Sequence, residues 1–197
     1  MKDAQVNELL YQALETEICG QSIYRAAIES AVEDDLKSEW QKYLEETTEH
    51  ERILRETFQA LGMDTEKDTP GRGVVRHKAE SLIAAMRMAS NDGGPEAAQL
   101  TAAECVVEAE TKDHQNWELI GRVAESSNGK RASALKEAYD QVEEQEDEHL
   151  YHTMGWAREL WIKSLGMPAV LPPPEEEKKV KTAIGAARAE KSRDEML

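Results

Sequence analysis

Long apolar runs, paired cysteines and an excess of positive charge are all missing from this sequence of 197 residues. No stretch reaches the roughly 20 apolar residues that a transmembrane helix needs, and no secretory signal is visible, which excludes a membrane-spanning class. Cys19 and Cys105 form no Cys-x-x-Cys pair, so we expect two free thiols in a reducing compartment. These absences together predict a cytoplasmic protein.

The charge balance is strongly acidic. The chain has 24 Lys and Arg residues against 40 Asp and Glu residues, which gives a formal net charge of −16. A nucleic-acid-binding body would need a basic face, so this class of protein is excluded. An acidic surface attracts metal cations, although we expect most of this charge to lie on a solvated exterior.

Strand patterns are absent as well, and phenylalanine occurs only once. The composition is dominated by good helix formers, and Gly and Pro cluster at a few points that separate helical segments. The predicted long helices cover about residues 4–32, 36–61, 95–125 and 130–165, and a shorter helix covers 74–90. Four long helices with one long connection between the second and third predict an all-α, ferritin-like four-helix bundle.

The bundle is expected to occupy residues 1–171. Residues 172–197 begin with three prolines, and residues 175–197 hold six acidic and six basic side chains. This composition predicts a charged, flexible C-terminal tail, with docking to a protein partner as the alternative.

Each long helix carries a stripe of apolar residues at alternating steps of three and four, which is the pattern of a buried helix face. Each stripe is interrupted near its middle by a carboxylate or an imidazole group. The residues at these interruptions are Glu17, Glu46, His50, Glu110, His114, Glu146 and His149. The histidines are the sharper signal, because the chain has only five and three of them fall on inward stripes.

Two explanations of these polar residues compete. In the first, they bind no metal and are either hydrogen-bonded core residues or surface residues that the stripe assigns to the wrong face. In the second, they are ligands of a metal ion. Burying several carboxylates together without a cation is very costly, which favours a metal site. Di-iron bundles take one Glu from each of two helices and Glu-x-x-His from each of the other two.

The fourth helix fits this motif directly with Glu146 and His149. The second helix does not, because Thr47 stands three residues before His50. Either Glu46 and His50 bind metal as an i, i+4 pair, or Glu46 and Glu49 bind it and His50 lies outside them. We prefer the first arrangement, since His50 lies on the apolar stripe. Two further acids, Glu108 and Glu144, lie in polar rows of their helices and are expected to face water.

The first two helices resemble the YciE/YciF family of ferritin-like bacterial proteins. The resemblance rests on Glu17, on the segment Leu44-Glu45-Glu46-Thr47, on Leu61-Gly62 and on the segment HKAESLI of the shorter helix. It implies a ferritin-like bundle, a homodimer, a di-metal centre and a link to bacterial stress response. It also implies that Glu17 and Glu46 are ligands.

This sequence departs from the family pattern at His50, where glutamine is expected. The family register would also take Glu108, Glu144 and Glu148 as ligands, in conflict with the stripes, which select Glu110, Glu146 and His149. The additional histidines make the sequence similar to rubrerythrin-like proteins as well. The four-cysteine module that supplies electrons in those proteins is absent here.

The sequence therefore leaves two functional hypotheses. The first is a protein that holds two iron or manganese ions and reacts with O2 or peroxide, in stress response or iron handling. Glu46 and Glu146 would bridge the ions, Glu17 and Glu110 would be terminal ligands, and the histidines would each bind or tune one ion. The alternative is a helical scaffold without metal, in which Trp40, Trp117, Trp156 and Trp161 serve packing or a dimer face.

Overall fold

All regular secondary structure in the computed structural model is helical, and the structure describes residues 1–173. The predicted all-α class is therefore confirmed for this part of the chain. The five helices are α1 (Asp3–Ser30), α2 (Asp34–Leu61), α3 (Pro70–Asp92), α4 (Pro95–Glu125) and α5 (Gly129–Ser164). Among the described residues, none of these helices is apolar over a length that would cross a bilayer. The predicted tail lies outside the described residues, apart from its first two positions.

The helices end where the sequence places its helix-breaking residues. Gly62 follows α2 with φ at +69°, a left-handed conformation that suits glycine. Pro95 occupies the first turn of α4, where its missing N–H costs no hydrogen bond. The shorter helix begins at Pro70, four residues before its predicted start, because the Thr69 side chain accepts a hydrogen bond from the Arg72 amide and caps it.

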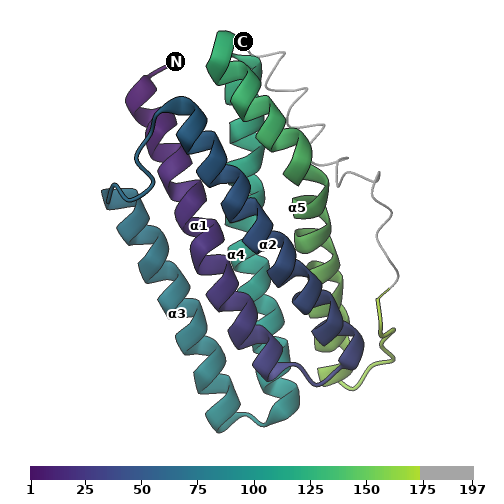
Figure 1. Cartoon of the computed structure of the whole chain (residues 1–197). Helices are drawn as coiled ribbons and strands as arrows, with labels where there is room; N and C mark the ends of the chain where they lie inside the picture. The colour runs from purple at the N-terminus through teal and green to yellow at the C-terminus, as the bar shows by residue number, and fades with distance from the viewer. Residues whose placement is uncertain (174–197) are drawn as a thin grey trace, which may run out of the picture.

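Four of the helices form a closed ring of contacts. In this ring α1 packs against α2 and α4, and α5 packs against the same two helices. Within residues 1–173, α3 packs only on α1 and α4, and Figure 1 shows it alongside α1 at the outer edge of the molecule. Helix α3 therefore covers one side of the ring, and its Ala79 and Met86 join one of the apolar clusters of the interior.

The interior contains two separate apolar clusters with a polar layer between them. On α1, Leu14 belongs to one cluster and Ile23 to the other, and Glu17 lies between them. On α5, Val142 and Trp156 occupy the same two clusters. The polar residues that interrupt the sequence stripes fall between these points on each helix, so the two clusters enclose the candidate site from both ends.

Candidate metal centre

Five of the seven predicted ligands are buried in the polar layer. Each of these five side chains is at most 4% exposed: Glu17, His50, Glu110, Glu146 and His149. Glu108 and Glu144 are exposed, in agreement with the stripe analysis and against the register that the family resemblance implies. The helical period thus predicted the burial of Glu110 and Glu146 and the exposure of Glu108 and Glu144.

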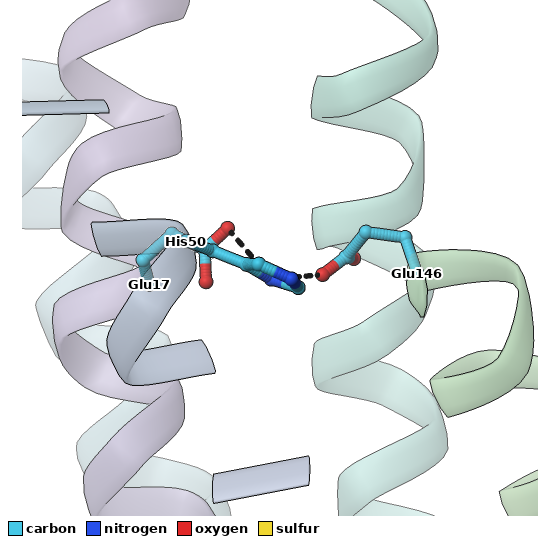
Figure 2. A group of neighbouring side chains, drawn as sticks. All are labelled: Glu17, His50 and Glu146. Atoms are coloured by element: carbon cyan, nitrogen blue, oxygen red, sulfur yellow. Dashed lines mark ion pairs between the residues drawn. The ribbon is translucent and has the colours of Figure 1, made fainter. Parts of the chain in front are cut away.

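The buried residues form two groups that share one carboxylate. Glu17, His50 and Glu146 offer ligand atoms that all lie within 4.8 Å of one another, and Glu110, Glu146 and His149 do the same. Figure 2 shows the first group, with His50 between the two glutamates. Each group brings together two carboxylates and one imidazole, and either group could hold a metal ion.

Both imidazoles turn the same nitrogen toward the carboxylates. The Nδ1 atom of His50 is 3.0 Å from Glu146 Oε1, and that of His149 is 3.8 Å from the same oxygen. Neither contact is a hydrogen bond, and neither Nδ1 atom has a hydrogen-bond partner among residues 1–173. Each ring therefore directs an unpaired nitrogen at the shared carboxylate.

The opposite nitrogens are both held by acceptors. His50 Nε2 donates to Gln145 Oε1 at 2.7 Å, and His149 Nε2 donates to Glu46 Oε2 at 2.9 Å. An ionised carboxylate accepts only, so Nε2 of His149 carries a proton, and in the neutral tautomer the lone pair lies on Nδ1. Metal-binding histidines usually donate their other N–H in this way, which fixes the ring and its tautomer.

Glu46 takes a different position from the one expected of a bridging ligand. Its oxygens accept hydrogen bonds from Gln145 and His149, and Lys42 Nζ is 3.7 Å from Oε1. The position three residues before His50 is filled by Thr47, which is 2% exposed and cannot act as a carboxylate ligand. Glu146, not Glu46, therefore belongs to both groups, and Glu46 supports the back of the His149 ring.

His114 also lies outside the two groups. Its Nε2 is 2.7 Å from Asp147 Oδ1, and this hydrogen bond raises the pKa of His114 although burial opposes it. The neighbouring Asp113 is buried instead, at 4% exposed, and its Oδ1 has no hydrogen-bond partner among residues 1–173. The sequence analysis missed Asp113, although its spacing of three from Glu110 was a usable signal.

The carboxylates of the layer are poorly suited to carry charge without a cation. Burial, followed by the charges of the neighbouring acids, raises the pKa of Glu17, Glu110 and Asp113 well above the ordinary range. Burial likewise raises the pKa of Glu146 to about 7. Burial lowers the pKa of His50, so this ring is held neutral. A neutral imidazole beside crowded carboxylates is what a divalent cation needs in order to bind.

The donor set also restricts the kind of metal. Carboxylate oxygens and imidazole nitrogens suit iron, manganese and zinc, and neither cysteine joins the two groups. Several donor atoms remain unpaired among residues 1–173: Glu17 Oε2, Glu110 Oε2, both Glu146 carboxylate oxygens and both histidine Nδ1 atoms. Buried polar atoms are rarely left without partners, so this concentration of them fits a bound cation.

Aromatic side chains around the two ligand groups contact the candidate ligands. Trp117 Nε1 donates to Glu17 Oε1 at 2.8 Å and leaves the other oxygen free to bind. The Tyr43 ring packs on His149 with centroids 4.3 Å apart, and its hydroxyl pairs with His152 Nδ1 at 3.1 Å. These contacts restrict the rotamers of two candidate ligands.

Comparison of the chain with protein-family models, curated proteins and solved structures finds no match.

Proposed function

We propose that this chain is a ferritin-like di-metal protein that binds two iron or manganese ions and reacts with O2 or peroxide. One observation carries the proposal. Two Glu-Glu-His groups meet at Glu146, and their facing donor atoms are buried without partners in the described residues. Such a pair of sites with a common carboxylate is the arrangement that bridged metal pairs use in helix bundles.

The residues divide into matching sets. Glu17 and His50 would bind one ion, Glu110 and His149 would bind the other, and Glu146 would bridge them. Glu17, Glu110, Asp113 and Glu146 together carry four negative charges when ionised, and two divalent cations balance them. Asp113 thus contributes charge at the site even where it does not touch an ion.

When bound, such a metal pair supplies two electrons to O2 or peroxide. The chain supplies the surroundings for this chemistry. The two apolar clusters exclude water at either end of the layer, and Gln145 and Glu46 keep the imidazole protons on the outer nitrogens. Tyr24 is fully buried beside Glu110, where its hydroxyl opposes the burial-raised pKa of that carboxyl.

The resemblance to the YciE/YciF family extends this proposal. It predicts that the ring of four helices is a ferritin-like bundle, that the protein is a homodimer and that it takes part in bacterial stress response. These three statements stay predictions. Light scattering tests the dimer, because a shell of many subunits would give a far larger mass.

Metal analysis of protein purified without chelator tests the function. We expect about two iron or manganese ions per chain, as in other bridged carboxylate pairs. The loaded protein should then consume peroxide in the presence of a reductant. A protein that carries no metal, and takes up none when supplied with Fe2+ or Mn2+ without O2, would leave the scaffold hypothesis in its place.

A further inference from the structure

A cavity of about 490 Å³ lies between α1, α3 and α4 and reaches the polar layer. Its wall combines residues of the proposed centre with residues that no part of the proposed function uses. The cavity is much larger than a water molecule, whose share of liquid volume is about 30 Å³, so O2 or peroxide alone would not fill it. Its size falls in the range of small-molecule sites.

The inner end of the cavity is formed by Glu110 and Asp113. Both side chains are 4% exposed, and Glu110 Oε2 and Asp113 Oδ1 have no hydrogen-bond partner among residues 1–173. A molecule in the cavity would therefore approach the metal pair from the Glu110 side.

Much of the remaining wall is apolar. Its apolar residues include Ile23 of α1, Val75, Ala79 and Leu82 of α3, and Ala109 of α4, beside the polar Gln12, Thr16, Cys19 and Ser81. Val75 and Ala79 are buried, although α3 lies on the outside of the four-helix ring. These apolar side chains suit the hydrocarbon part of a bound molecule.

The outer end of the cavity is mostly basic. Lys78 and His77 are exposed, and the half-buried Lys112 lines the same cavity. Lys112 Nζ donates to Asn116 Oδ1, and neither lysine forms an ion pair with a carboxylate among residues 1–173. Glu108 is the one acid at this rim. On a chain of net charge −16, two neighbouring ammonium groups at this opening favour an anion over a cation.

We propose that this cavity binds a small organic acid with an apolar body, with its carboxylate held by Lys78 and Lys112 and its hydrocarbon end directed at Glu110 and Asp113. This deepens the proposed function and rests on it, because the bound molecule would be the organic substrate of the metal centre. The exposed basic groups suit the carboxylate of such a molecule, and the buried apolar side chains suit its body.

Calorimetric titration of the full-length, metal-loaded protein with octanoate, octanol and octylamine tests the assignment. Octanoate should bind at one site, at least about tenfold more tightly than octanol, since a single charged hydrogen bond contributes about that factor. Octylamine should bind most weakly. The double variant Lys78→Gln/Lys112→Gln should lose the preference for octanoate and keep its affinity for octanol.

Two further variants complete the test. Ala79→Leu narrows the apolar part of the cavity and should weaken octanoate and octanol alike. Lys37→Gln removes an exposed lysine of α2 outside the cavity and should change neither affinity. Metal content is measured on every variant, so that loss of ligand binding is separated from loss of the centre.

The assignment is overturned if octanoate does not bind, if octylamine binds as tightly, or if the double variant keeps the octanoate preference. Failure of octanoate binding in a protein that carries two ions refutes the cavity assignment alone. Absence of metal, with octanoate still bound through the two lysines, refutes the proposed function and leaves an acid-binding cavity.

Discussion

At the scale of single residues, Glu146 is the side chain on which both ligand groups depend. It is 1% exposed, and neither of its oxygens has a hydrogen-bond partner within residues 1–173. Its neighbour two positions back, Glu144, is exposed. Two helical residues differ by about 200° in direction, so these two acids make a matched pair for a test.

Glu146→Ala should lower bound metal from about two ions per chain to less than one, because a bridging carboxylate serves both ions. His149→Ala should remove mainly one ion. Both are measured by elemental analysis after gel filtration. Glu144→Ala is the control, and it should keep the metal and change the free energy of unfolding by at most about 0.5 kcal/mol. The reverse result, with metal lost only in Glu144→Ala, would show that the family register describes α5.

The sequence could predict the inward side chains because the helical period alone determines them. It selected His114 of α4 and passed over Asp113, because a step of four from Glu110 and a step of three both keep a residue on the same face of a helix. The sequence also could not predict that Glu46 lies behind the His149 ring. This position depends on Gln145 and His149 of another helix, and so on how α2 and α5 pack.

At the scale of helices, close packing between α4 and α5 depends on Gly121. A methyl group added at this position would come within 2.8 Å of the Tyr139 ring. Gly73 of α3 is a natural comparison, because a methyl group there would meet nothing within 4 Å.

We expect Gly121→Ala to destabilise the protein by about 1–3 kcal/mol, the usual cost of overpacking, despite the better helix propensity of alanine. Gly73→Ala should instead stabilise it by about 0.5–1 kcal/mol through that propensity. Urea unfolding followed by circular dichroism measures both. Equal effects of the two substitutions would mean that α4 and α5 are farther apart than described here.

Helix α3 is held to α1 by a buried ion pair. Arg72, 7% exposed, donates through Nε to Glu15, which is 3% exposed, and through Nη1 to the carbonyl oxygens of Thr65 and Lys67. Arg76 Nη1 lies 3.2 Å from the same Glu15 carboxylate. These contacts fix the start of α3 against α1, and both helices line the cavity.

Arg72→Ala should cost about 3 kcal/mol of unfolding free energy, because it leaves Glu15 buried with only the half-exposed Arg76 as a partner. Arg87→Ala, at an exposed site near the other end of α3, should change it by no more than about 0.5 kcal/mol. Urea denaturation of the metal-free protein separates the two. A small effect of Arg72→Ala would show that Glu15 is hydrated.

The Gly, Pro and capping residues of the sequence predicted all five helices, and most predicted ends lie one or two residues from the ends in the structure. The start of α3 was missed because Pro70, Gly71 and Gly73 are typical of a loop. Pro in the first turn and a capping Thr69 override that signal once the helix packs on α1. How α3 lies across α1 and α4 depends on the Arg72 contacts, which no local pattern contains.

At the scale of the whole molecule, the stability of the metal-free protein should depend on pH through its buried acids. The folded-state pKa values of Glu17, Glu110, Asp113 and Glu146 are raised, so the unfolded chain releases these protons at lower pH than the folded one. The stabilisation from protonated acids is complete at low pH and is lost as pH rises through the folded-state values. The lowered pKa of His50 makes stability rise with pH below about pH 6.5. This effect comes from a single group, whereas four acids act in the other direction.

We therefore expect metal-free protein to unfold at a lower temperature at pH 8 than at pH 5.5. For Glu146 alone, a pKa of about 7 against an ordinary 4.5 corresponds to a contribution on the order of 3 kcal/mol. Metal-loaded protein should show the reverse trend, since the ions bind the ionised carboxylates. Differential scanning calorimetry with and without chelator measures both forms. Identical pH profiles for the two forms would contradict a metal site in the polar layer.

The sharing of Glu146 by two groups has a consequence for how the ions would bind in succession. The first ion must displace the proton that burial keeps on this carboxyl group near neutral pH. The second ion then meets a carboxylate that is already ionised and already oriented. Filling of the two positions is therefore coupled, and the coupling weakens as the solution becomes more alkaline and the first proton leaves unaided. A metal titration should be more cooperative at pH 6 than at pH 8, with the shared side chain acting as the link between the two steps.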